Sequence, residues 1–156
     1  MSSPRARQRV HLSESAHWLM RPAPSLFHLS MHEASHIESL LEQVQAAVVD
    51  SALSGKVTSI IVDCGRLSGV EPQLAAIAFQ RLAPRFGLAD ATLELRETSV
   101  RVRCEACRGE RTLTDLNFQC AACGSTQLAV LSGDAFILQQ IVIETDDSPS
   151  SNSSHP

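Results

Sequence analysis

Residues 104–124 read CEACRGERTLTDLNFQCAACG, in which two Cys-x-x-Cys pairs are separated by twelve residues. The two thiolates of such a pair can bind one ion from a single tight turn, and two turns complete a tetrahedron of sulfur ligands. The spacing is close to that of known zinc sites. Zinc is the ion that a tetrahedral four-sulfur site favours, although a rubredoxin-like iron site uses the same ligands. We therefore predict a zinc ion bound by Cys104, Cys107, Cys120 and Cys123.

The predicted zinc has a structural role. All four ligand positions are cysteine, so none stays open for water or a substrate. The surrounding segment, residues 103–133, is too short to fold on an apolar core alone. Zinc binding, worth about 10–16 kcal/mol in small finger peptides, would supply its folding free energy. Glu105 and Glu110 alternate with nearby arginines, which predicts a solvated face rather than a phosphate-binding track. These arginines are Arg101, Arg103, Arg108 and Arg111.

Helical and strand patterns alternate on both sides of this segment. Residues 31–53 carry apolar side chains at helical spacing, and Pro72 suits the first turn of a second helix. Residues 57–64 (VTSIIVDC) are typical of a strand buried on both faces, with Cys64 as a buried, inert thiol. Further strands are predicted over residues 91–102 and 135–143. The apolar sides predicted for the helices are Ile37, Leu41, Val44 and Val48 in the first, and Leu74, Ile77, Ala78 and Leu82 in the second.

The order of these elements predicts an α/β fold. Two helices cover a small three-stranded sheet, and a four-cysteine zinc-ribbon subdomain is inserted before the last strand. The α/β domain comprises residues 31–102 and 134–144, and the zinc-binding subdomain comprises residues 103–133. Because the ion would hold Cys104 near Cys123, we expect the two strands that flank the insert to pair antiparallel with each other.

Both ends of the chain differ in composition from this core. Residues 1–30 hold four arginines and three prolines against one acidic residue, which predicts a disordered extension. An upstream start codon, with the natural start at Met31, is the explanation we favour for it, ahead of an Arg- and Ser-rich transit peptide. Residues 145–156 are rich in Ser, Asp and Pro, which predicts a disordered tail.

The overall composition argues against several classes of protein. An apolar fraction of 44% is ordinary for a globular domain, and a formal net charge of −4 disfavours a dedicated nucleic-acid binder. No stretch approaches the roughly 18 consecutive apolar residues of a membrane helix, and the first thirty residues lack a secretory signal. We therefore predict a cytoplasmic protein, whose reducing surroundings keep the paired cysteines available for a metal.

Residues 32–36 (HEASH) match the H-E-x-x-H pattern of zinc peptidases. In that chemistry two histidines one helical turn apart bind zinc, and the glutamate is the general base. A third protein ligand is then needed, yet the next histidine is His155, in the predicted tail. The pattern fixes only three positions and stands at the start of a predicted helix. A peptidase is therefore a remote alternative, and a zinc-ribbon adaptor that binds nucleic acid or protein is a nearer one.

Several short motifs follow one another along residues 31–144. Residues 31–33 (MHE) open an amphipathic helix, residues 65–72 read GRLSGVEP, the paired cysteines come next, and residues 132–134 (SGD) precede the last strand. In this order they resemble the HypA/HybF family of hydrogenase nickel-incorporation proteins. The resemblance implies a non-enzymatic metallochaperone that delivers Ni(II) during maturation of nickel–iron hydrogenase, and in some organisms of urease. The implied partners are a nickel-handling GTPase and the hydrogenase large subunit, with no nucleic acid and no membrane.

The same resemblance implies that His32 is the nickel ligand, that Glu33 supports it, and that the four cysteines bind zinc. The preferences of the ion agree, because Ni(II) favours square-planar nitrogen and oxygen donors. His32 can supply its imidazole and backbone nitrogen, and a free amine at Met31 would complete the chelate. Thirty residues precede Met31 here, so its nitrogen is an amide. Either the mature chain begins at Met31, or nickel binds differently, with His28 or His36 as a further donor.

Overall fold

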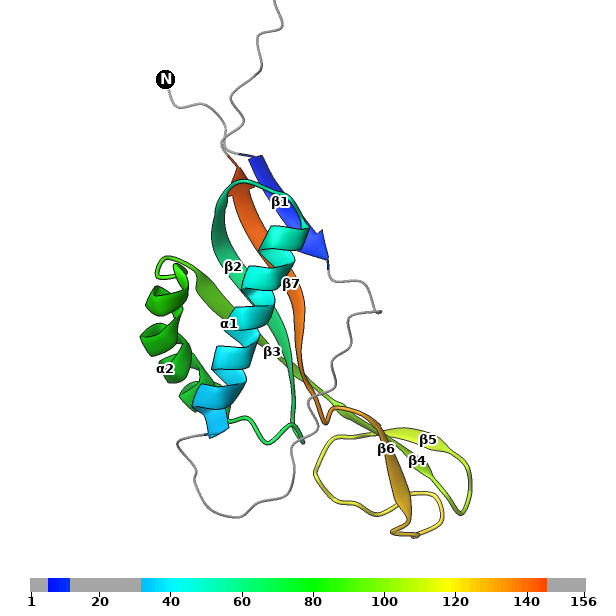
Figure 1. The fold of residues 1–156 in the computed structure, drawn as a ribbon. Coiled ribbons are helices and arrows are strands. Elements are labelled where there is room, and N and C mark those ends of the chain that lie inside the picture. The colour runs from blue at the N-terminus through cyan, green and yellow to red at the C-terminus, as the bar shows by residue number, and fades with distance from the viewer. Residues whose placement is uncertain (1–5, 12–31, 146–156) are drawn as a thin grey trace, which may run out of the picture.

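The computed structural model describes residues 6–11 and 32–145 (Figure 1). Within them, the larger sheet has the strand order β1-β7-β2-β3 and the smaller sheet the order β5-β4-β6. Figure 1 shows both helices on one side of the larger sheet and the smaller sheet projecting from one end. The elements are β1 (Ala6–His11), α1 (His32–Asp50), β2 (Lys56–Gly65), α2 (Pro72–Leu82), the 3-10 helix η2 (Ala83–Phe86), β3 (Thr92–Thr98), β4 (Val100–Cys104), β5 (Glu110–Leu113), β6 (Leu128–Ser132) and β7 (Phe136–Thr145).

The predicted fold class, two helices on one sheet with an inserted four-cysteine subdomain, is confirmed. The sheet has a fourth strand, because β1 pairs antiparallel with β7 from Ala6 opposite Thr145 to His11 opposite Gln140. Val10 of β1 also packs against the core. The prediction of disorder for residues 1–30 is therefore wrong for residues 6–11. The rest of that segment, and the tail after Thr145, lie outside the described residues.

The strands that flank the cysteine segment do not pair with each other, contrary to the prediction. β2 lies between them and pairs parallel with β3 and antiparallel with β7. The strand predicted over residues 91–102 breaks at Ser99 into β3 and β4, and β4 leaves the larger sheet. β4 then pairs antiparallel with β6. The antiparallel pairing beside the two cysteine pairs is thus made between β4 and β6, at residues 101–104 and 128–132.

The main core lies between the helices and the larger sheet. The side of α1 predicted to be apolar is confirmed, because Ile37, Leu41 and Val44 are fully buried. The side predicted for α2 is right for Ala78 and Leu82, which pack against the core, but wrong for Leu74 and Ile77, which are 38% and 46% exposed. Ala75 and Phe79 are buried in their place. Both candidate faces of α2 include Ala78 and Leu82, so helical spacing alone could not choose between them.

A second, smaller core stabilises the cysteine subdomain. Val100, Val102 and Leu113 are buried in it, and Leu67 and Leu128 pack against it at the edge. Three buried side chains are too few to stabilise a fold by themselves, which agrees with a need for a bound metal. Leu67 comes from the GRLSGVEP loop between β2 and α2, so this loop docks the α/β domain onto the subdomain.

Three polar contacts strengthen the same junction. The Arg66 guanidinium donates through Nη1 to the backbone oxygen of Thr114, at 2.8 Å, and its Nε lies 3.3 Å from Oε1 of Glu97. The backbone N–H of Leu67 donates to the carbonyl of Gly133, also at 2.8 Å. The loop therefore contacts β3, the subdomain and the turn before β7 at once.

Candidate metal centre

The sulfur atoms of Cys104, Cys107, Cys120 and Cys123, referred to below as the thiol cluster, all lie within 4.8 Å of one another. The Sγ–Sγ distance is 3.6 Å between Cys104 and Cys123 and 3.7 Å between Cys107 and Cys120. An ideal tetrahedron with Zn–S bonds of about 2.3 Å places its sulfur atoms about 3.8 Å apart. The thiol cluster therefore fits a tetrahedral zinc ion, and the structure brings together all four cysteines predicted to bind it.

Each Cys-x-x-Cys pair is shaped by the same backbone turn. The N–H of Arg108 donates to the carbonyl of Cys104 at 2.9 Å, and the N–H of Gly124 donates to the carbonyl of Cys120 at 2.8 Å. Arg108 and Gly124, which follow the second cysteine of each pair, are both left-handed, with φ of 62° and 72°. The two turns are equivalent, except that one has an arginine in a conformation that favours glycine.

The four thiols differ in how readily they lose a proton. The pKa of Cys120 is lowered to about 6, chiefly because the backbone N–H groups of Ala122 and Cys123 donate to its sulfur. The pKa of Cys123 is instead raised to about 11. A hydrogen bond from the Ser125 amide lowers this pKa, but the Cys104 side chain, burial and the other thiols raise it by more. Negative charges on neighbouring sulfur atoms therefore repel one another, and a divalent cation bound between them would offset this repulsion.

Arg111 was not predicted to be part of this centre, but it lies against the thiol cluster. A hydrogen bond to the Cys120 side chain, followed by the charge of that group, raises the pKa of Arg111. Its Nε is buried and has no hydrogen-bond partner among the described residues. An arginine here offsets part of the negative charge of four thiolates on one Zn²⁺. The alternation of β5 could have revealed it, because Arg111 is two residues from the buried Leu113.

The residues predicted to bind nickel stand at the start of α1. His32 is the first residue of the helix, but its side chain, like all of Met31, lies outside what the structure describes. Glu33 is only 7% exposed, and its Oε2 is buried without a hydrogen-bond partner among the described residues. Burying an ionised carboxylate costs free energy unless it is paired. A cation at this end of α1 would supply that pairing.

The start of α1 lies at the end of the larger sheet where the subdomain is attached (Figure 1). His36, one turn into α1, packs its ring against Phe136, the first residue of β7, with the ring centroids 6.3 Å apart. Among the side chains that the structure describes, the thiol cluster is the only group of three or more potential metal ligands. His28 and His155 lie outside the described residues.

The fifth cysteine takes no part in either site. Cys64 is 3% exposed at the end of β2, and burial is the main cause that raises the pKa of its thiol. Its sulfur lies 3.7 Å from the Ser68 hydroxyl and 3.8 Å from the Val70 carbonyl. A buried thiol with a raised pKa forms little thiolate, so the prediction of an inert structural cysteine agrees with its surroundings.

Within the described residues, no helix has the length and apolar character that a membrane crossing needs.

Comparison with known proteins matches most of the chain to one family. The family described as hydrogenase/urease nickel incorporation, metallochaperone, hypA matches residues 31–143. The chain is 31% identical over 116 residues to the hydrogenase maturation factor HypA of Aquifex aeolicus, which covers 74% of this chain and all of that protein. It is 36% identical over 117 residues to the hydrogenase maturation factor HypA of Chlorobaculum tepidum. The match covers 73% of this chain and 100% of that protein.

A likeness in three dimensions agrees with the sequence match. The solution structure of the Ni metallochaperone HypA from Helicobacter pylori matches with a TM-score of 0.56 at 21% identity, over 70% of this chain and 94% of that chain. At this identity the likeness shows the fold. Strand β1 lies outside residues 31–143 and is an addition to the matched region.

Proposed function

Because this chain belongs to the HypA family of hydrogenase/urease nickel-incorporation metallochaperones, we propose that it receives and releases Ni(II) at the start of α1, through His32. Delivery of nickel during the maturation of hydrogenase is the function of the family. The matched residues include α1 and the thiol cluster, so this function replaces the adaptor and peptidase alternatives. Urease is a second possible recipient, which the family description includes.

The observation that carries the placement of nickel is the buried carboxylate of Glu33, which directly follows His32. The positive end of the α1 dipole offsets part of its charge, but one oxygen has no partner among the described residues. Glu33 directly follows His32 in the chain, so its carboxylate belongs to the same first turn of α1 as the proposed nickel ligand. Glu33 then stabilises the bound cation and orients its surroundings without having to be a ligand.

An incomplete set of ligands suits a cargo ion. His32 offers one imidazole and one backbone nitrogen, and Met31 offers an amide nitrogen in this chain, so positions stay open for a donor from the recipient. The thiol cluster has the opposite design, because four cysteines close the coordination of zinc. We therefore assign the two metals to separate sites, zinc as a permanent structural ion and nickel as transient cargo.

Several finer features of the function follow from this assignment. We propose that the chain has no catalytic role of its own and acts on a nickel-handling GTPase and on the hydrogenase large subunit. We also propose that it acts in the cytoplasm, because the thiol cluster must stay reduced to hold zinc. The contact of His36 with Phe136, the first residue of β7, lies one helical turn from the proposed cargo site.

Complementation of a strain that lacks this protein tests the proposal. The strain would carry the wild-type chain, His32→Ala, Glu33→Gln, or His11→Ala as a matched control from the exposed end of β1. We expect His32→Ala to leave hydrogenase activity near background, Glu33→Gln to reduce it partly, and His11→Ala to restore it fully. Immunoblots and the zinc content of the purified variants show that each chain folds. Full hydrogenase activity with His32→Ala would contradict the assigned site.

A further inference from the structure

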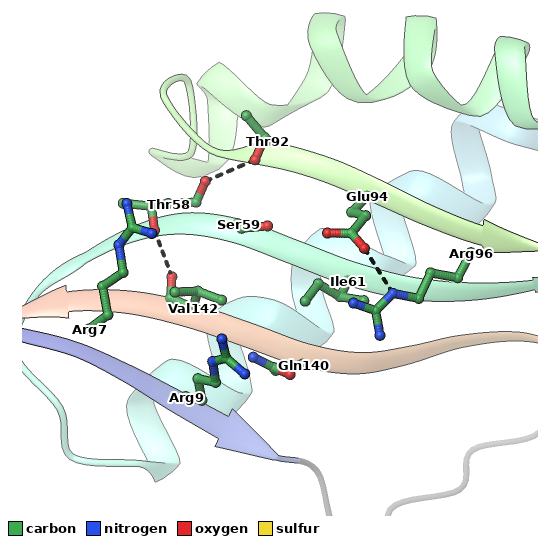
Figure 2. A pocket seen from close by; sticks show the side chains of 10 residues that line it. All are labelled: Arg7, Arg9, Thr58, Ser59, Ile61, Thr92, Glu94, Arg96, Gln140 and Val142. Atoms are coloured by element: carbon green, nitrogen blue, oxygen red, sulfur yellow. Dashed lines mark hydrogen bonds and ion pairs between the residues drawn. The ribbon is translucent and has the colours of Figure 1, made fainter.

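The face of the larger sheet that is turned away from the helices carries a cavity of about 380 Å³ (Figure 2). All four strands contribute to its wall. Arg9 lies opposite Val142, Val142 opposite Ser59, and Ser59 opposite Thr92, so this row of side chains points to one face. The residues that alternate with them, such as Ile141, belong to the core beneath the helices. The row therefore lies on the uncovered face.

Positive charge prevails in the wall of this cavity, which has three arginines and one acidic residue. Nε of Arg7 lies 3.0 Å from Oε1 of Glu144, and Nε of Arg96 lies 2.8 Å from Oε1 of Glu94. Arg9 has no ion pair among the described residues. Its charge is therefore available to an anion in the cavity.

A buried amide points at the same place. Gln140 is 8% exposed, and its Nε2 is buried without a hydrogen-bond partner among the described residues. Gln140 and Arg9 are diagonal neighbours on one face of β7 and β1, because Arg9 lies opposite Val142, two residues along β7. Figure 2 shows the Arg9 guanidinium beside the Gln140 amide nitrogen. Two donor groups thus converge with no acceptor between them.

We propose that this cavity binds a small oxyanion, a carboxylate or a phosphate, between Arg9 and Gln140. A guanidinium presents paired N–H donors that match the two oxygens of such a group, and the buried amide supplies a third donor. The volume is in the range of about 300–1,000 Å³ that small-molecule sites occupy. Two of the three arginines belong to β1, outside the residues that match the nickel-incorporation family. His32 does not line the cavity, so the proposed site is separate from the proposed nickel site.

Titration of the full-length, zinc-loaded chain tests this proposal, with potassium phosphate and citrate as separate probes at constant ionic strength. Amide NMR shifts and the thermal midpoint report binding. We expect shifts confined to the strands that line the cavity, and the probe that binds more tightly tells phosphate from carboxylate. Arg9→Gln should weaken binding about tenfold or more, because it removes a charged hydrogen-bond donor. Arg85→Gln, which changes an exposed arginine of η2, should leave binding unchanged.

A second variant keeps the test decisive if Arg9→Gln disturbs β1. Gln140→Leu removes the unpartnered amide and should weaken binding roughly threefold to tenfold without lowering the thermal midpoint of the free chain. The proposal is overturned if neither probe shifts the spectrum, or if Arg9→Gln and Arg85→Gln bind equally well. Either result leaves nickel binding at His32 untouched, because His32 is not part of this cavity.

Discussion

Replacement of Gly65 by alanine should separate the α/β domain from the cysteine subdomain at their junction. A Cβ atom at Gly65 would lie 2.4 Å from the carbonyl oxygen of Gly133 and 2.9 Å from the backbone nitrogen of Asp134. Both neighbours are backbone atoms, so the chain must move by about 1 Å to restore ordinary contact. That movement lengthens the hydrogen bonds from Gly65 to Ala135 and from Leu67 to Gly133, both 2.8 Å.

The magnitude follows from these contacts. Loss of two backbone hydrogen bonds costs about 1–3 kcal/mol, and overpacking against the backbone adds about 1–3 kcal/mol. We therefore expect Gly65→Ala to lower the free energy of unfolding by roughly 2–5 kcal/mol, measured by urea unfolding with zinc present. Gly69→Ala is the matched control, because φ is +76° there but no atom lies within 4 Å of the added Cβ. It should cost about 1 kcal/mol, from backbone conformation alone.

The comparison of the two alanine variants decides whether the junction is packed as described. Faster amide exchange at Leu67 in Gly65→Ala, with unchanged exchange in the middle of α1, would locate the damage at the loop. A Gly65→Ala chain no less stable than Gly69→Ala would refute the reasoning, because the close approach to Gly133 would then impose no constraint.

Three further changes test other parts of the structure. Arg108→Gly should raise the free energy of unfolding by about 0.5–1 kcal/mol, because glycine adopts φ of 62° without strain; an unchanged urea midpoint would contradict this. Iodoacetamide should modify no cysteine of the zinc-loaded chain and four cysteines after zinc chelation. Cys64 should react only in denaturant, since burial raises the pKa of its thiol. Early labelling of Cys64, seen by mass spectrometry, would refute its burial. Arg66→Met should lower the free energy of unfolding in urea by about 1–2 kcal/mol, because it removes the hydrogen bond to Thr114. Arg96→Met, which removes only an exposed ion pair, should lower it by under about 0.5 kcal/mol. Equal losses in the two variants would argue against a stabilising hydrogen bond from Arg66 to Thr114.

The parts of the fold that rest on local spacing could be read from the sequence. Two Cys-x-x-Cys pairs define a tetrahedral site whatever surrounds them, so the thiol cluster was predictable residue by residue. The β-branched run of β2 has few alternatives to a buried central strand. The apolar side of α1 is continuous, and its burial follows from helical spacing alone.

The parts that depend on distant contacts could not be read in the same way. The partner of β1 is β7, about 135 residues away along the chain, and a short Arg-rich strand has the composition of a disordered segment until that edge is present. Two faces of α2 satisfy the helical period, and packing against α1 selects the one with Ala75. At Ser99 the chain passes from the larger sheet to the smaller one, where the partners of β4 are β5 and β6.

In the candidate sites, too, some features could be predicted from the sequence and others depend on the fold. Arg111 looked like one of several solvated arginines, because no strand was predicted over residues 110–113. Once β5 is known, alternation places Arg111 on the same side of the strand as the buried Leu113. The burial of Glu33 depends on how the start of α1 packs, which spacing does not report. The identity of the cargo came from the order of motifs along the chain, which the family match over residues 31–143 confirmed.

Calorimetric titration of the zinc-loaded, full-length chain with Ni²⁺ tests the assignment of separate cargo and structural sites most directly. Wild type and His32→Ala are compared, with zinc counted by mass spectrometry before and after each titration. We expect the wild-type chain to bind about one nickel, His32→Ala to bind none, and both to keep their zinc, since the thiol cluster is closed to exchange. An unchanged nickel isotherm in His32→Ala, or nickel uptake matched by zinc loss, would contradict the account.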